Sequence, residues 1–362
     1  MQNILSNYIM NKIDRIPKNT GRLYFMDVLR GVAIILVIYN HFFTYYLHTD
    51  SVFNNLCLFW RMPLFFFISG FFSYTVNCGA DKIKKKVENR LYRQLYPTLI
   101  VCAIYLVCMI LLQPELNVKE VVFHTIYDPA KRGYWFTFSL VQVFLAFMIV
   151  LYLFNRYKLS RRAQGIIIFC LTVASSIPAV TGFSSFDEVP FMRRFISVMS
   201  MEKTIGLLPF FLFGVLCRIY EKEFLQLMGK PVCFILAISF FGICSLFSSD
   251  IAYYLHRWFS LIAVISLFTI FREFFSTKSM AGRYLIRIGK QTLPIYLFHF
   301  FILLLLSTFA ADLIDPFIRL INNPVVEIAI VGLLSVMVLE VVLWFDSKLS
   351  KWTAVHKLIY SY

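Results

Sequence analysis

Long apolar stretches recur along the whole chain, and they constrain its fold more than any other feature. Ten of them approach the roughly 20 residues that a helix needs to cross ~30 Å of hydrocarbon. Apolar residues make up 59% of the 362 positions and charged residues only 15%, whereas a soluble domain is about half apolar and about a quarter charged. The sequence therefore predicts an all-α polytopic integral membrane bundle. The expected spans are 23–47, 57–77, 95–113, 134–154, 163–180, 204–219, 231–249, 255–275, 290–310 and 325–345.

A single membrane domain is expected at 23–345, between a polar tail at 1–22 and a second tail at 346–362. No cleavable signal peptide is expected, because the first apolar stretch carries Asp27 and Arg30 and lacks a small-residue cleavage site. The eight cysteines form no Cys-x-x-Cys motif and no paired Cys/His set. They are interpreted as small apolar packing residues, and no metal site is expected.

The Lys and Arg residues of the connections predict the orientation. If both tails are cytoplasmic, the cytoplasmic segments hold 25 of the 35 Lys and Arg residues and the outer connections hold 8. The other two, Arg30 and Arg61, fall inside membrane spans. Since cytoplasmic loops carry the excess of cations, both termini are predicted to be cytoplasmic. The +15 net charge is then explained by orientation and contact with anionic lipid, and no nucleic-acid partner is expected.

Arg30 and His41 lie inside the first apolar stretch, which reads LYFMDVLRGVAIILVIYNHFFTYYL. A charged side chain is costly within a membrane and usually serves a function there. The two residues are eleven positions apart. A helix therefore places them within roughly 20° of each other around its axis and about 16 Å apart along it. One helical face is predicted to carry a cation and a proton-transfer group at two depths.

Depth along the predicted helices sorts the intramembrane polar residues into two layers. His41 and Arg61 are expected in the outer leaflet, and His48, one heptad beyond His41, is expected at the interface. The remaining candidates are Asp27, Arg30 and Glu340 in the inner leaflet, with His299 and Gln142 near the midplane.

Structural interpretations of these residues stay open. Asp27 and Arg30 are an i,i+3 pair that can neutralise itself, with or without Glu340. Arg61 can instead extend to the outer lipid headgroups. His299 suits a hydrogen-bonded packing position as well as a functional one.

Several blocks of sequence follow one another in a characteristic order from the first apolar stretch to the ninth. They are Asp27-Val-Leu-Arg30-Gly31 with Asn40-His41, the segment RMPLFFFISG from Arg61 to Gly70, Tyr134-Trp135-Phe136, and Gly289-Lys290-Gln291 with Ile295-Tyr296-Leu297-Phe298-His299. In this order and spacing the chain resembles the acyltransferase-3 family of membrane-bound acyltransferases. The Arg-x10-His pair and MPLFFFISG are the most specific parts of the resemblance.

The resemblance implies transfer of an acyl group, usually acetyl, from coenzyme A to a hydroxyl of a cell-envelope carbohydrate. Members with this compact layout are similar to fucose and exopolysaccharide O-acetyltransferases. Acyl-CoA is then a co-substrate, no tightly bound cofactor is expected, and the expected location is a bacterial inner or cytoplasmic membrane. Arg30 and His41 take the place of the family's essential first-helix pair.

The chemistry of acyl transfer suits the same residues. An attacking hydroxyl needs a base, and the pKa of histidine suits both uptake and return of its proton. His41 is the candidate base, or alternatively a transient acyl carrier. Arg61 is suited to stabilise the oxyanion or to hold the acceptor. Arg30, Arg90 and Arg93 are suited to bind the polyanionic donor. Arg90 and Arg93 can equally be charges near lipid that orient the chain in the membrane.

A transporter or flippase for a lipid-linked saccharide is the alternative, because helices with intramembrane charges are typical of transporters as well. The sequence offers no inverted repeat and no matched pair of broken helices in its support.

Overall fold

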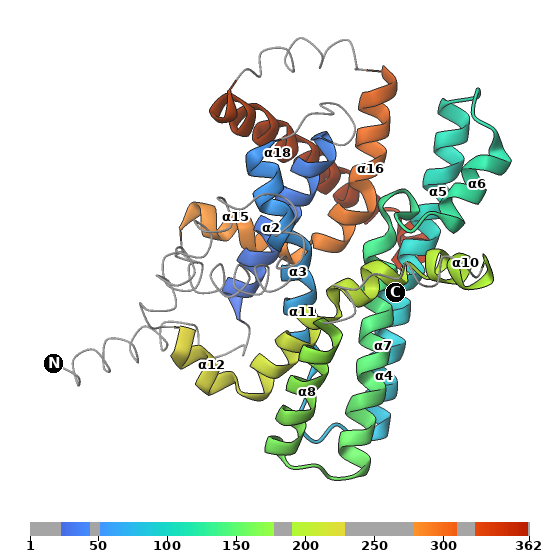
Figure 1. Cartoon of the computed structure of the whole chain (residues 1–362). Helices are drawn as coiled ribbons and strands as arrows, with labels where there is room; N and C mark the ends of the chain where they lie inside the picture. Colours follow the sequence, from blue (N-terminus) through green and yellow to red (C-terminus); the bar gives the residue numbers. More distant parts are fainter. Residues whose placement is uncertain (1–22, 44–50, 177–189, 229–278, 310–322, 361–362) are drawn as a thin grey trace.

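The structure is a computed structural model, and it describes residues 23–43, 51–176, 190–228, 279–309 and 323–360. The elements in these ranges are helices joined by turns, with no strand among them (Figure 1). The predicted all-α membrane bundle is therefore confirmed.

Six helices of the described ranges are long and apolar enough to cross a membrane. A seventh span arises if α10 (Pro190–Val198) and α11 (Met201–Ile219), which are bent by 51° relative to each other, cross together. The expected span 163–180 corresponds to α8 (Arg161–Ser176), which has 16 residues. The expected spans 231–249 and 255–275 lie outside the described residues. The count of ten and the cytoplasmic termini stay predictions. The six helices are α2 (Tyr24–Phe42), α3 (Val52–Ser73), α4 (Ala80–Arg90) continuing into α5 (Tyr96–Leu112), α7 (Trp135–Arg156), α16 (Thr292–Phe309) and α18 (Pro324–Leu349).

The third span begins 15 residues before the predicted start at position 95, because α4 joins α5 through the π-helical turn η2 (Leu91–Leu95). Hydropathy could not show this part of the helix, since it is rich in Lys, Glu, Arg and Gln. Those residues are nevertheless good helix formers. Arg90 and Arg93, expected at the mouth of a helix, therefore lie within a continuous one.

Helix α15 (Met280–Lys290) was expected to be a connection, and it crosses α2 at two glycines. A Cβ on Gly31 would lie 2.4 Å from the carbonyl oxygen of Leu285, and one on Gly289 would lie 1.8 Å from that of Asp27. Neither position has room for a side chain. This close approach fixes the end of α2 that carries Arg30.

Helices α3 and α11 approach each other in the same way. A Cβ on Gly70 would lie 1.9 Å from the carbonyl oxygen of Phe211, and one on Gly214 would lie 2.1 Å from that of Phe67. The run Leu64–Phe67 is buried, so it packs inside the protein rather than against lipid.

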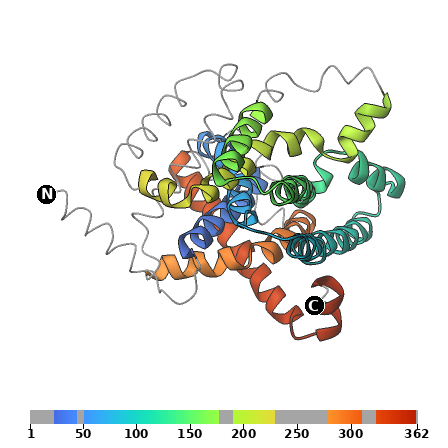
Figure 2. The ribbon, with the colours of Figure 1, turned by 90° about the horizontal axis from the view of Figure 1, so that it is seen from below.

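Helices α2 and α3 occupy the centre of the described structure, and α11, α15, α16 and α18 pack around them (Figures 1 and 2). α4 and α7 run side by side next to this centre. The shorter elements are α6 (Val118–Tyr127), η3 (Lys131–Gly133), α12 (Glu221–Met228) and α19 (Thr353–Tyr360).

Candidate active site

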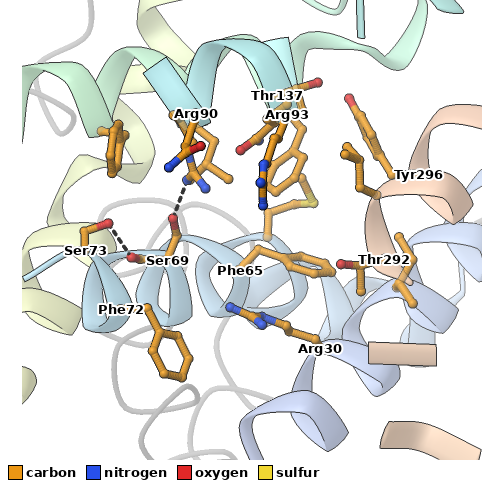
Figure 3. Close-up of a pocket in the computed structure, with 18 of the residues that line it drawn as sticks. Arg30, Phe65, Ser69, Phe72, Ser73, Arg90, Arg93, Thr137, Thr292 and Tyr296 are labelled. Atoms are coloured by element: carbon orange, nitrogen blue, oxygen red, sulfur yellow. Dashed lines mark hydrogen bonds between the residues drawn. The ribbon is translucent and has the colours of Figure 1, made fainter. Parts of the chain in front are cut away.

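A cavity of about 470 Å³ lies between α2, α3, α4 with η2, α7 and α16 (Figure 3). Helix α2 lines it with Arg30, Ile34 and Val37, which share one helical face at positions i, i+4 and i+7. His41 is the next residue on that face. The predicted alignment of Arg30 with His41 therefore follows one wall of the cavity.

Three of the other four walls can be followed in the same direction. Going from the Arg30 side toward His41, α3 lines the cavity from Ser73 to Met62 and α7 from Phe144 to Phe136, while α16 lines it from Thr292 to Tyr296. We call the two limits the cationic end (Arg30, Lys86 and Arg90) and the histidine end (Val37, Met62, Phe136 and Tyr296). His41 lies one helical turn beyond Val37, and His299 lies one turn beyond Tyr296.

Arg90 enters the cavity from α4 (Figure 3). Its Nη2 donates to Ser69 Oγ at 2.6 Å, and its guanidinium lies 4.8 Å from the centre of the Phe144 ring. Its Nε is buried and has no hydrogen-bond partner among the described residues. Both contacts are with uncharged groups, so the positive charge remains available to an anion.

Arg30 faces the cavity from α2, opposite the wall that carries Arg90 and Arg93 (Figure 3). Its Nη1 lies 3.5 Å from Asp27 Oδ1, and its guanidinium lies 5.2 Å from the centre of the Phe72 ring. The expected i,i+3 pair is therefore present. The Arg30 side chain keeps 29% of its surface exposed, which leaves it accessible from the cavity.

His41 and His299 stack against each other at the histidine end, with ring centroids 5.2 Å apart. The ring of Phe300 lies 4.9 Å from that of His41. His299 Nδ1 donates to the carbonyl oxygen of Ile295 at 3.0 Å, because a carbonyl can only accept. This leaves His299 Nε2 buried without a hydrogen-bond partner among the described residues. The sequence placed these histidines in different layers, and the structure brings them together.

Arg61 is only 4% exposed and lies close enough to His41 to act on it electrostatically. Helix α3 begins at Val52, five residues before the predicted start, so Arg61 sits near its middle. Long side chains on a helix point toward its N-terminus, and Arg61 Nη1 reaches Asn54 Oδ1 at 3.1 Å. The guanidinium therefore points toward the N-terminal end of α3.

A chain of hydrogen bonds continues from Asn54 to α18. The Asn54 backbone N–H donates to Ser51 Oγ at 3.1 Å, which caps α3. The Ser51 hydroxyl donates to Glu327 Oε1, and so does the Tyr39 hydroxyl, at 2.9 Å. This network joins α2, α3 and α18, and it holds the residue that orients Arg61.

Two of the predicted site residues, Glu340 and Gln142, make their contacts away from the residues that line the cavity. Glu340 accepts from the Tyr284 hydroxyl at 2.7 Å and from Arg287 Nη2 at 3.3 Å, which ties α18 to α15. Burial and the bond to Glu340 raise the pKa of Tyr284. Gln142 Nε2 donates to the carbonyl oxygen of Met199 at 2.8 Å, at the bend between α10 and α11. His48 lies outside the described residues.

Sequence reasoning missed Lys86, which lines the cavity beside Arg90. Its Nζ donates to the carbonyl oxygen of Ser73 at 2.7 Å and to Thr75 Oγ1 at 2.6 Å. A signal was available, because Lys86, Arg90 and Arg93 recur at i, i+4 and i+7 and so share one helical face. Tyr296 was quoted only as part of a motif, and it lines the histidine end.

The family model for an acyltransferase domain, that of the acyltransferase-3 family, matches residues 23–344. The match includes every helix that lines the cavity and both of its ends. The chain therefore belongs to the acyltransferase-3 family and is a membrane acyltransferase. Searches of curated proteins and of solved structures find no significant match.

Proposed function

We propose that this acyltransferase transfers an acyl group, acetyl being the expected one, from acyl-CoA to a hydroxyl of a cell-envelope or exported carbohydrate. One observation carries the proposal: a single cavity follows the α2 face from the cations at Arg30 and Arg90 to the turn before His41. A donor with a charged head and a reactive end matches that arrangement.

The cationic end suits the phosphates of coenzyme A. Arginine binds phosphate oxygens through two parallel N–H groups, and such charge-assisted hydrogen bonds are about twice as strong as neutral ones. Arg90 meets uncharged partners, and Arg30 and Arg93 approach from opposite walls of the cavity. Lys86 is the third cation of this end, and Arg93 lines the same cavity.

The histidine end suits the transfer itself. His41 accepts the proton of the acceptor hydroxyl as its oxygen attacks the thioester carbonyl. The new C–O bond forms, the C–S bond breaks, and the proton passes from His41 to the departing thiolate of coenzyme A. Arg61 stabilises the oxyanion that forms between the two steps. His299, packed against His41, holds its ring in place. In the alternative route, His41 attacks the thioester and carries the acyl group to the hydroxyl.

Arg30 and His41 are about 16 Å apart along α2. We expect the pantetheine arm to cover that span, so that the nucleotide stays near the cytoplasmic cations while the acyl group reaches the outer side. The predicted orientation, with cytoplasmic termini, supports this sidedness. Reporter fusions after Lys86 and at Tyr362 are expected to report the cytoplasm.

Sealed vesicles test the function and its sidedness together. Acetyl-CoA supplied on the cytoplasmic face is expected to label envelope glycan enclosed in the opposite compartment, with release of free coenzyme A. Labelling only when donor and glycan share the cytoplasmic compartment would contradict the proposed sidedness. Movement of a lipid-linked saccharide without consumption of acetyl-CoA would favour the transporter.

A further inference from the structure

The middle section of the cavity, between the cationic end and the histidine end, is mostly apolar. Its lining includes Ile34, Phe65, Leu140 and Leu293. In the proposed function this section holds the pantetheine arm of the donor. The arm contains two amide groups, and an amide that leaves water without finding a hydrogen-bond partner weakens binding. The polar side chains of this section are therefore the ones to compare with the arm.

Gln94 lines the middle section from the wall that carries Arg90. Arg90 bonds to Ser69, and Lys86, one turn earlier, bonds to α3 four residues beyond Ser69. α4 and α3 therefore run antiparallel to each other. The next turn after Arg90 places Gln94 at the level of Phe65, which lies four residues before Ser69.

Thr292 lines the same section from α16 (Figure 3). It is the first residue of that helix and lies one turn before Tyr296. Gln94 uses only its backbone carbonyl, which accepts from the Thr98 hydroxyl at 2.7 Å. Neither Thr292 nor Gln94 forms a side-chain hydrogen bond with any other residue that the structure describes. A glutamine amide and a threonine hydroxyl can each donate and accept, so both can pair with an amide that enters the cavity.

The other uncharged polar side chains of the cavity are already engaged or lie elsewhere. Four hydroxyl groups that line it form hydrogen bonds within the protein: those of Ser69, Ser73, Thr137 and Tyr296. Asn89 directly precedes Arg90 and belongs to the cationic end. Within the described ranges, Gln94 and Thr292 are therefore the polar groups of the middle section that remain for a ligand.

We propose that Gln94 and Thr292 bind the two amide groups of the pantetheine arm, and that the enzyme thereby selects pantetheine thioesters as donors. This inference rests on the proposed function, in which the phosphates lie at the cationic end and the thioester lies at His41. Gln94 is one turn from Arg90, so it takes the amide nearer the phosphates. Thr292 is one turn from Tyr296, so it takes the amide nearer the thioester.

Donors with an altered amide test this inference on the purified enzyme. In two analogues of acetyl-CoA, one amide or the other is replaced by an ester, which keeps the shape of the group and removes its N–H donor. The measured quantity is kcat/KM, from release of the thiol with envelope glycan as acceptor. The wild type is expected to use each analogue about 10-fold less well than acetyl-CoA, because a polar group left unpaired in the cavity costs about that factor.

Gln94→Leu and Thr292→Val remove the two partners with little change in side-chain volume. Each is expected to lower kcat/KM for acetyl-CoA about 10-fold. In Gln94→Leu, an ester at the amide nearer the phosphates is expected to cause no further loss, while the other ester still lowers kcat/KM about 10-fold. Thr292→Val is expected to show the reverse pattern. Such non-additivity isolates the contact between one side chain and one amide.

Gln113→Leu is the matched control. Gln113 follows the last residue of α5, at the far end of the continuous helix that carries Gln94, and it does not line the cavity. The substitution exchanges the same amide for the same apolar side chain. Because no donor amide reaches this position, kcat/KM is expected to keep the wild-type value with all three donors.

Two results would overturn the inference while leaving the proposed function in place. One is a wild type that uses both ester analogues as well as acetyl-CoA, a result that needs no variant to fold. The other is no change, or a change by the same factor for every donor, in folded Gln94→Leu and Thr292→Val. If the wild type consumes neither acetyl-CoA nor the analogues, the donor assignment itself is wrong, and the inference is overturned with it.

Discussion

The two ends of the cavity differ in charge, packing and access. The cationic end gathers Arg30, Lys86 and Arg90, whose side chains stay partly exposed. Lys86 and Arg90 bond to uncharged groups, and Arg30 pairs with Asp27. The histidine end is closely packed, with His299 at 0% exposure beside the buried ring of Phe300. A partly exposed cationic surface suits binding of a soluble polyanion. A closely packed site suits the chemical step, because charges act more strongly on a reacting group where little water enters.

Helix α2 joins these two ends, and its position is fixed at several places. The glycine crossing with α15 holds its cationic end, while the Tyr39 bond to Glu327 holds its histidine end to α18. The distance between the binding cations and the histidine is then set by a rigid helix. The comparison therefore predicts that substitutions at the two ends change different kinetic constants.

The largest effect is expected for His41→Ala. Loss of a general base costs about 10²–10⁴-fold in rate, so kcat is expected to fall by that factor while the protein still inserts in the membrane. Measured turnover with acetyl-CoA checks this. His124→Ala, which removes an exposed histidine of α6, serves as control. Near-normal turnover in His41→Ala would exclude the histidine from the chemistry.

Arg61→Gln is expected to have the next largest effect. Removal of one oxyanion-stabilising donor typically lowers kcat by about 10²–10³-fold. The KM for acetyl-CoA is expected to change little, because Arg61 belongs to the histidine end. Steady-state kinetics separate the two constants. A wild-type kcat would instead limit Arg61 to a structural role, through its buried bond to Asn54.

Arg90→Gln is expected to act on binding. A hydrogen bond to a charged group contributes about 1.5–3 kcal/mol, so the KM for acetyl-CoA is expected to rise about 10- to 100-fold while kcat stays close to the wild-type value. Lys84→Gln is a matched control on the same helix, because the Lys84 side chain is 78% exposed. A large fall in kcat with unchanged KM would remove the distinction between the two ends.

Asn54→Ala is expected to have the smallest effect. Asn54 accepts a hydrogen bond from Arg61 and does not itself touch the proposed reacting atoms. Its loss frees the guanidinium, and kcat is expected to fall about fivefold, the equivalent of about 1 kcal/mol for one hydrogen bond. In Arg61→Gln the additional Asn54→Ala change is expected to have no effect. Equal losses in both backgrounds would show that Asn54 acts independently of Arg61.

The sequence predicted the features that depend only on positions within one helix. The alignment of Arg30 with His41 and the pairing of Arg30 with Asp27 depend only on spacing along one helix. The helical segments at 80–94 and 280–290 were missed because they are polar, and a search for apolar runs does not detect polar helices. The contact of His41 with His299 was missed for another reason. It depends on how α2 packs against α16, and single-sequence patterns do not specify packing between distant helices.

The central claim is that one end of the cavity binds the donor and the other performs the transfer. Equilibrium binding of acetyl-CoA to purified wild type, His41→Ala and Arg90→Gln tests it most directly. The account predicts that His41→Ala binds with wild-type affinity although it does not turn over, and that Arg90→Gln binds at least about 10-fold more weakly. Equal loss of affinity in both variants, or wild-type binding by Arg90→Gln, would contradict it.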